Sequence, residues 1–213
     1  MSAPVRFRHL VLEDVEPPPT ARELAAIEER LGATLPASYC AFLEQGNGAS
    51  LAFYVCPSRS PDGTSPRVGP ARFHSTRLYG GWGTLLFELE QARTNVFQLP
   101  PRILPIAEGW SAPVFLDLTP EGAGRVVVFR RGLPGWTGLP TDSAWLDVAP
   151  SFEAYLNALE LDREELAHEV ANSPTTSAHV AAWETHLDLL APDWRDDERL
   201  RGALEAARGR VGG

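Results

Sequence analysis

Histidine side chains are the first place to look for chemistry at neutral pH, and the chain has five of them. His179 and His186 are seven residues apart, so both would lie on one side of a helix. A metal site would need at least one more ligand close by, and neither an HExxH motif nor a cysteine cluster occurs. We therefore expect these histidines on a helix surface and no bound metal.

Nucleophilic catalysis has no recognisable motif in the chain. Cys40 stands in an apolar helical segment, and we expect both Cys40 and Cys56 to be buried thiols. No G-x-S-x-G motif occurs, and the run Gly80–Gly83 lacks the phosphate-loop pattern in a chain without lysine. The sequence thus predicts no catalytic residue and no cofactor. An enzyme with a carboxylate pair brought together by folding stays open as an alternative.

The charge of the chain is acidic and unevenly distributed. The formal net charge is -9, and residues 151–213 hold 13 acidic and 6 basic residues, against 15 and 13 in residues 1–150. Binding to nucleic acid needs a basic face, so direct contact with nucleic acid is not expected. An acidic excess in one segment steers a basic protein partner, although it also serves solubility alone.

Tryptophans beside charged or glycine-rich residues are the candidate contacts for such a partner. The run 193–198 surrounds a tryptophan with carboxylates, which suits either a solvated helix N-terminus or an aromatic anchor for a basic protein. Two further tryptophans, in the glycine run and in the loop 133–140, are also expected to be accessible. The predicted partner-binding residues are Trp82, Trp136, Asp193, Trp194, Asp196, Asp197 and Glu198.

The elements that must position these side chains begin with a pair of helices between Thr20 and Gly48. Thr20 and Glu23 form a capping box, and Gly32 stands where a helix end favours a left-handed residue. Pro36 suits the first position of the second helix. The apolar stripes of the pair are expected to be buried against a sheet; they comprise Leu24, Ile27, Leu31, Tyr39, Phe42 and Leu43.

Alternation and turn residues predict a set of short strands after this pair. Residues 113–118 and 125–131 flank a glycine-containing turn and should form an antiparallel hairpin, with Phe115, Leu116, Val126 and Val128 in the core. Residues 5–12 fit either a strand or a short helix. Further strands are expected at residues 51–56, 71–79, 102–107 and 144–148, a helix from 151, and a loop at 57–70. Residues 85–96 fit either a strand or a helix, and we favour the helix for its length.

Three amphipathic helices are expected near the C-terminus, at residues 161–171, 176–190 and 196–208. We divide the chain into a domain of residues 1–162 and a helical extension of residues 163–213. The stripe Val180, Trp183, Leu187 and Leu190 is expected to pack the extension onto the domain. No apolar run is long enough to span a membrane, and the charged N-terminus is unlike a signal peptide, so we expect a cytoplasmic protein.

Residues 28–48 read E-x-x-L-G-x-x-L-P-x-S-Y-x-x-F-L-x-x-x-N-G, which resembles the start of the SMI1/KNR4 family, also called the SUKH superfamily. The order Leu-Pro-Ile (104–106), Phe-Leu-Asp-Leu (115–118), Val-Val-Val-Phe (126–129) and Ser-Phe-Glu-Ala-Tyr-Leu (151–156) resembles its closing half. The resemblance covers residues 22–162. It departs from the family where a glycine-rich run is usual, because only Gly109 stands between Ile106 and Pro113.

The resemblance implies an α+β fold, in which an antiparallel sheet has helices packed against it. It also implies a binding protein without enzymatic activity. Bacterial members of the family commonly act as immunity proteins that bind and neutralise a cognate toxin of a polymorphic toxin system. Many such toxins are basic and act on nucleic acids, which matches the acidic balance of this chain. The alternative is a regulatory or scaffold module, as the yeast members are taken to be.

Overall fold

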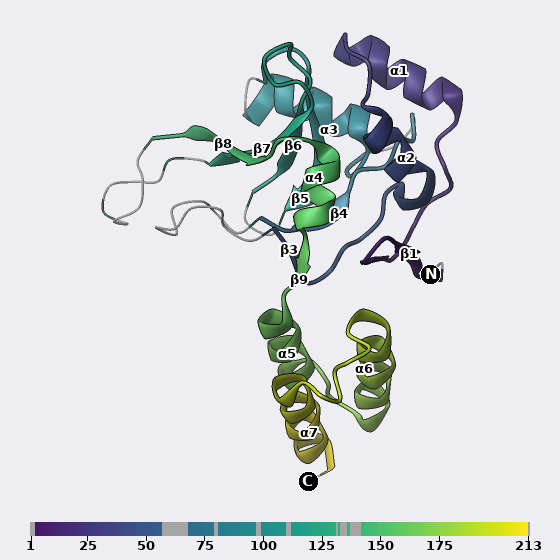
Figure 1. Cartoon of the computed structure of the whole chain (residues 1–213), viewed down its shortest axis with the longest axis vertical. Helices are drawn as coiled ribbons and strands as arrows, with labels where there is room; N and C mark the ends of the chain where they lie inside the picture. The colour runs from purple at the N-terminus through teal and green to yellow at the C-terminus, as the bar shows by residue number, and fades with distance from the viewer. Residues whose placement is uncertain are drawn as a thin grey trace. The chain divides into compact units, whose positions relative to one another are not determined.

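The computed structural model describes residues 3–56, 68–78, 81–96, 99–109, 112–130, 132, 136 and 142–212. The chain divides into two compact units, residues 1–160 and 161–213, which we describe separately. The first unit combines helices with antiparallel strands, and the second consists mainly of helices, so the predicted α+β class with a helical C-terminal region is confirmed (Figure 1). Among the described residues, none of the helices is both long and apolar enough to cross a membrane.

The first unit contains a hairpin, two helices near its start, a five-stranded sheet with a helix in the chain between its first two strands, and a helix after the sheet. In chain order its elements are β1 (Val5–Phe7), β2 (Leu10–Leu12), α1 (Ala21–Leu31), α2 (Ala37–Gly46), β3 (Tyr54–Val55), β4 (Pro70–Phe73), α3 (Leu85–Gln91) with a π-helical turn (Ala92–Val96), β5 (Ile103–Gly109), β6 (Val114–Asp117), β7 (Arg125–Arg130), β8 (Ala144–Ala149) and α4 (Phe152–Ala158). The short strand β9 (Glu160–Leu161) straddles the boundary between the units.

The predicted helical pair is present with the predicted caps. Thr20 and Glu23 form the capping box at the start of α1, and Gly32 ends the helix with a left-handed φ of 71°. Pro36 stands one position before α2, as its N-cap, and not at the first helical position that the sequence indicated. Of the predicted core residues on the pair, only Leu24 is half-exposed, and the other five are buried.

The sheet has the strand order β4-β5-β6-β7-β8, and every neighbouring pair is antiparallel. The predicted hairpin of β6 and β7 is confirmed, with Phe115 opposite Val127 and Leu116 opposite Val126. Aromatic rings join the helices to the sheet: the Phe42 ring on α2 lies 4.5 Å from that of Phe73 on β4 and 5.4 Å from that of Phe152 on α4. This aromatic cluster packs α2 against β4 and α4.

Some predicted segments are shorter than expected. The strand expected at residues 51–56 is reduced to Tyr54–Val55, and that expected at 71–79 ends at Phe73. Residues 5–12, for which strand and helix were both open, form the β1–β2 hairpin. Most of the loop expected at 57–70 lies outside the described residues.

The second unit contains α5 (Arg163–Asn172), α6 (Ser177–Leu190) and α7 (Glu198–Gly212). Side chains of Asp162 and Thr176 cap α5 and α6 by accepting from backbone N–H groups of Glu165 and His179. Helix α7 packs against both other helices, and the unit has an apolar core of its own, which includes Leu166, Val170, Val180, Leu187, Leu190, Trp194, Leu200 and Leu204. Trp183 is only half-buried. The packing of this unit onto the domain stays a prediction.

Candidate protein-interaction surface

The glycine-rich segment before α3 presents Trp82 to solvent. The backbone N–H of Ser75 donates to the carbonyl of Gly83 at 2.8 Å, and the N–H of Leu85 donates to the carbonyl of Ser75 at 2.8 Å, so the C-terminal side of the turn is anchored. Gly83 has a φ of 83°, which a residue with a side chain rarely adopts. The turn leaves the Trp82 side chain 80% exposed.

A charged cluster lies beside this turn, with Glu16 at its centre. The Arg77 Nε atom lies 2.7 Å from Glu16 Oε2, and Arg72 Nη2 lies 3.7 Å from Glu16 Oε1. The Ser75 hydroxyl donates to Glu16 Oε2 at 2.7 Å. Because the Glu16 side chain is only 19% exposed, its carboxylate holds the two guanidinium groups in defined positions.

Asn47 brings the segments of this cluster together. Its side-chain amide donates to the carbonyl of Pro17 at 2.7 Å, while its Oδ1 atom accepts from the backbone N–H of Thr76 at 2.9 Å. The backbone N–H of Glu16 donates to the carbonyl of Asn47 at 2.8 Å. Asn47 follows α2, so the end of the helical pair fixes the position of Glu16 next to the segment after β4.

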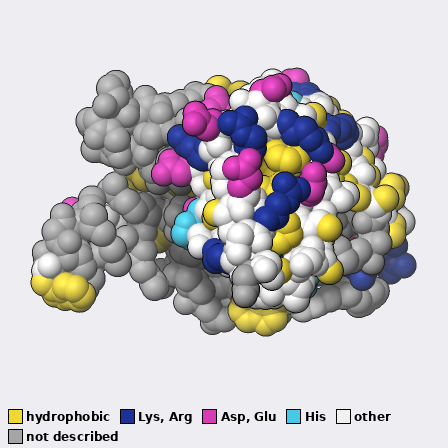
Figure 2. All heavy atoms as spheres, turned by 90° about the horizontal axis from the view of Figure 1, so that it is seen from below, with side chains coloured by type: hydrophobic (Ala, Val, Ile, Leu, Met, Phe, Trp, Pro, Cys, Tyr) yellow, Lys and Arg dark blue, Asp and Glu magenta, His cyan; other side chains and the backbone are white. Residues whose placement is uncertain are grey.

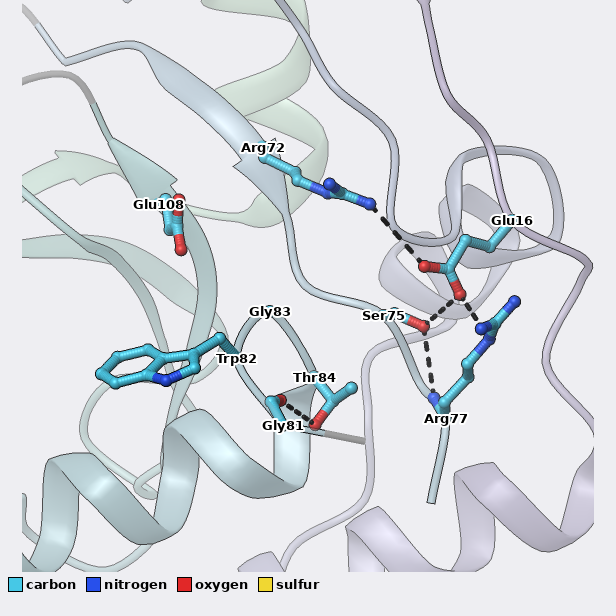
Figure 3. A pocket seen from close by; sticks show the side chains of 9 residues that line it. All are labelled: Glu16, Arg72, Ser75, Arg77, Gly81, Trp82, Gly83, Thr84 and Glu108. Atoms are coloured by element: carbon cyan, nitrogen blue, oxygen red, sulfur yellow. Dashed lines mark hydrogen bonds and ion pairs between the residues drawn. The ribbon is translucent and has the colours of Figure 1, made fainter. Parts of the chain in front are cut away.

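Glu108 on β5 is the second carboxylate of this region. It is the partner of Arg72 across the β4–β5 ladder, where opposite charges would ordinarily attract one another. Arg72 instead extends toward Glu16, and its Nε atom donates to the carbonyl of Gly48 at 3.2 Å (Figure 3). Glu108 is exposed, and among the described residues it has no ion pair.

These groups surround one pocket of about 370 Å³ that opens to solvent (Figure 3). Its charged side chains come from the segment after β2 and from β4, β5 and the residues after β4. The pocket is lined by Glu16, Arg72, Ser75, Arg77, Gly81, Trp82, Gly83, Thr84 and Glu108. It joins an exposed aromatic ring to charged groups of both signs, which is a composition suited to a protein partner.

The comparisons with known proteins can be set beside this geometry. The model of the SMI1 / KNR4 family (SUKH-1) matches residues 18–158. The chain belongs to this family. Neither the curated proteins nor the solved structures yielded a match. The match covers the helical pair, the five-stranded sheet and most of the pocket, whereas α5, α6 and α7 lie beyond the matched residues.

The acidic segment outside the SMI1/KNR4 match differs from the sequence prediction in one main respect. Trp194, expected to be an accessible anchor, is only 4% exposed. Its indole N–H donates to Asp188 Oδ1 at 2.8 Å, and the guanidinium carbon of Arg195 lies 4.3 Å from its ring centroid. Arg195 also forms an ion pair with Asp188. The prediction of an exposed Trp194 was therefore wrong, because Asp188 and Arg195 within the same unit already surround the ring.

The carboxylates around Trp194 are also engaged. Arg163 Nη2 lies 2.7 Å from Asp193 Oδ1, and its Nη1 atom lies 2.9 Å from Asp197 Oδ2. Asp197 also accepts from the backbone N–H groups of Arg199 and Leu200, so it caps α7. Hydrogen bonding from Arg163 lowers the pKa of Asp193. Burial acts to raise the pKa of Asp197, but the bonds from Arg163 and the helix N-terminus outweigh it and the pKa is lowered.

Asp196 and Glu198 are the members of the predicted acidic cluster that are exposed and form no ion pair with the described residues. The face drawn in Figure 2 carries arginine side chains among carboxylates, and not an unbroken acidic surface. Pairing of this kind shortens the reach of the acidic field, so the net charge of the segment overstates what a partner meets.

Trp136, the third predicted aromatic, is 87% exposed. Most of its chain neighbours between 131 and 141 lie outside the described residues. Its accessibility agrees with the expectation, and its role as a partner contact stays a prediction.

Buried ionisable groups that do not line the pocket occur in the core of the SMI1/KNR4 domain. Burial and the nearby Arg72 charge lower the pKa of His74 to about 4, and its Nδ1 atom has no hydrogen-bond partner among the described residues. Burial raises the pKa values of the Tyr39 and Tyr155 hydroxyls. Both cysteines are thiols; Cys56 is buried as expected, but Cys40 on α2 is only half-buried. The described residues contain no group of three or more His, Cys, Asp or Glu side chains placed to hold a metal ion.

Sequence reasoning found Trp82 but missed the charged residues that share its pocket. Its charged residues come from three separate stretches of the chain, which hold Glu16, then Arg72 with Arg77, and then Glu108, and no local spacing connects the three. A correct pairing of β4 with β5 would have placed Arg72 opposite Glu108. The turn of Arg72 toward Glu16 has no signal in the sequence.

Proposed function

We propose that this protein is an immunity protein that acts in the cytoplasm by binding a cognate bacterial toxin and covering its active site. The observation that carries the proposal is the exposed Trp82 in a charged pocket of a domain that belongs to the SMI1/KNR4 family. A large aromatic ring held on an anchored turn loses little conformational freedom when a partner covers it. Such a ring is therefore suited to a tight protein interface.

The partner proposed is a basic toxin that acts on nucleic acid. The protein has a net charge of -9, and an enzyme that handles nucleic acid needs a basic face for phosphate groups. Carboxylates of the immunity protein would occupy the positions that phosphates take in the substrate. The toxin would then be blocked by steric cover and by charge, without any chemical change.

Binding without catalysis is part of the same proposal. The buried groups with strongly shifted pKa values, His74, Tyr39 and Tyr155, lie in the core and do not line the pocket. A catalytic site usually places such groups in a cleft that substrate reaches. The pocket instead contains an ion-pair cluster with Glu16 at its centre, which is suited to a fixed contact surface.

The test starts from the reading frame next to the gene for this protein. Its product is expressed in a bacterial host alone, with this protein, and with the Trp82→Ala variant, and survival is counted as colonies. We expect the product of the adjacent reading frame to kill the host when it is expressed alone. Co-expression of the wild-type protein should protect fully, and co-expression of Trp82→Ala should protect less. Trp136→Ala serves as a matched variant, because it removes another exposed tryptophan from the same unit.

Purified proteins then separate binding from indirect protection. A stable one-to-one complex that inhibits the activity of the toxin in solution supports the proposal. A toxic neighbour that is neither bound nor inhibited by this protein contradicts it. Several unrelated partners of modest affinity, with no toxin beside the gene, would favour the regulatory or scaffold module.

A further inference from the structure

An arginine, a tryptophan and a carboxylate form a complete group in the C-terminal unit. The Arg195 guanidinium lies over the Trp194 ring at 4.3 Å and pairs with Asp188, while the indole N–H donates to the same carboxylate. A flat guanidinium gains from an aromatic face and a carboxylate together, because the ring attracts its charge and the carboxylate accepts its N–H groups.

The pocket of the first unit holds two members of such a group without the third. Trp82 and Glu108 line the same pocket, and both are exposed. The Trp82 ring contacts the Phe87 ring at 5.3 Å, which supports it while leaving most of it in solvent. Arg72, opposite Glu108 in the ladder, is directed to Glu16 and Gly48 and leaves the Glu108 carboxylate without an ion pair among the described residues.

We infer that the space between Trp82 and Glu108 is a receptor for an arginine side chain of a basic partner protein. The guanidinium would stack on the indole and donate to the Glu108 carboxylate, as Arg195 does with Trp194 and Asp188. This inference rests on the proposed function, because it assigns the contact that the basic toxin makes. Arginine fits the pair better than lysine, since only a planar fork both stacks and donates along one edge.

An anion is the competing occupant, since two arginines line the same pocket. Both guanidinium groups, however, already face the Glu16 carboxylate, with Arg77 Nε at 2.7 Å from it. An incoming anion would therefore be repelled by Glu16 as well as attracted by Arg72 and Arg77. Glu108 makes no ion pair with any of the described residues, so a cationic occupant gains an attraction that is otherwise unused.

The probe is the capped tripeptide acetyl-Gly-Arg-Gly-amide, and its control is the same peptide with citrulline, which is nearly isosteric but uncharged. The full-length protein is labelled with ¹⁵N, and the indole resonance of Trp82 is identified by its loss in Trp82→Phe. The arginine peptide is expected to shift that resonance saturably, and the citrulline peptide is not. Glu108→Gln should raise the Kd of the arginine peptide by about two- to fivefold, which is the range expected for loss of an exposed ion pair.

Glu121→Gln is the matched variant, because Glu121 is an exposed carboxylate of the same unit that does not line the pocket. It should bind the peptide as the wild type does. The inference is overturned if the Trp82 resonance ignores the arginine peptide, or if Glu108→Gln and Glu121→Gln behave alike. It is also overturned if inorganic phosphate shifts the resonance and Arg77→Gln abolishes that shift.

The same measurements separate this inference from the proposed function. Neutralisation of a toxin by a protein whose Trp82 resonance ignores the peptide would keep the proposed function and remove the arginine receptor. A peptide response that depends on Glu108, in a protein that neutralises no toxin, would keep the receptor and remove the immunity role.

Discussion

Trp82 and Trp194 lie among the same kinds of side chains but differ in exposure to solvent. Both tryptophans share their surroundings with carboxylates and with arginines. Trp194 is buried, its N–H is bonded to Asp188 and its ring is covered by Arg195. Trp82 is 80% exposed and shares its pocket with Glu108, which has no ion pair within the described part of the chain. The comparison teaches that acidic composition does not identify an interaction surface. What distinguishes the two regions is whether the aromatic ring is already covered, and whether a carboxylate near it is left without an ion pair among the described residues.

The largest expected difference between the two tryptophans concerns stability. Trp194→Ala should lower the free energy of unfolding of the C-terminal unit by about 3–5 kcal/mol, because it removes a large buried side chain. Trp82→Ala should change stability by less than about 0.5 kcal/mol, as exposed substitutions do. Urea denaturation followed by circular dichroism measures both. Equal losses in the two variants would remove the contrast between a structural and an accessible tryptophan.

Binding should show the reverse order. Trp82→Ala is expected to weaken the complex with the toxin by about 2 kcal/mol or more, roughly 30-fold in Kd, as truncation of a central aromatic contact does. Titration calorimetry with the purified toxin measures this, and circular dichroism of the variant confirms that it is folded. If affinity is unchanged while Trp136→Ala weakens it, the interface lies at the β7–β8 end of the sheet and not at the pocket.

Lowering the pH should destabilise the first unit before the second. His74 has a pKa of about 4 in the folded protein and about 6.5 when unfolded, so the unfolded state binds more protons between these values. Its contribution to stability is complete above pH 6.5 and is lost as the pH falls toward 4; from pH 7 to pH 5 the loss is about 2 kcal/mol.

The aspartates of the C-terminal unit behave differently, because ion pairs lower the pKa values of Asp188 and Asp193. Their contribution is present above the ordinary aspartate pKa and is lost only below it. Urea midpoints at pH 7 and pH 5 test the contrast, and His74→Gln should reduce the pH dependence of the first unit. An unchanged pH dependence in that variant would show that His74 is not the group responsible.

Neighbouring aspartates in the acidic segment should separate into two kinds. Asp197→Ala removes a helix cap and a partner of Arg163, and it should cost about 1 kcal/mol of stability. Asp196→Ala should cost much less, because Asp196 is exposed and has no ion pair in the part of the chain that the structure describes. Thermal unfolding of the two single variants provides the measurement. A larger loss in Asp196→Ala would contradict the assigned cap.

The smallest effect is expected on the rate of association. Asp196→Arg should slow binding of a basic toxin by a fewfold at low salt, and the difference should shrink as salt rises and the screening length falls to about 8 Å. Stopped-flow kinetics at several salt concentrations measures it. Asp197 is left unchanged here, since its reversal would also disturb α7. A rate that responds to neither salt nor Asp196→Arg would exclude the acidic segment from steering.

Local signals in the sequence were sufficient to predict the helical pair and the central hairpin. The capping box at Thr20, the left-handed Gly32 and the turn between β6 and β7 each act over a few residues, and the chain order of the family placed them in one fold. The burial of Trp194 could not be predicted from the run 193–198 alone. Its hydrogen-bond partner Asp188 lies six residues earlier, on α6, outside that run. The pocket was harder still to predict from the sequence, because its charged residues come together only when the sheet has formed.

Asn47 has a consequence for how such a protein can diversify. Its side chain reaches only backbone groups, the carbonyl of Pro17 and the N–H of Thr76, and its own carbonyl accepts from the backbone of Glu16. These three bonds therefore do not depend on which side chains Glu16, Pro17 and Thr76 contribute. Substitutions at other positions around the pocket can accumulate over generations without breaking them, so the surface can change while Asn47 keeps the two segments in place.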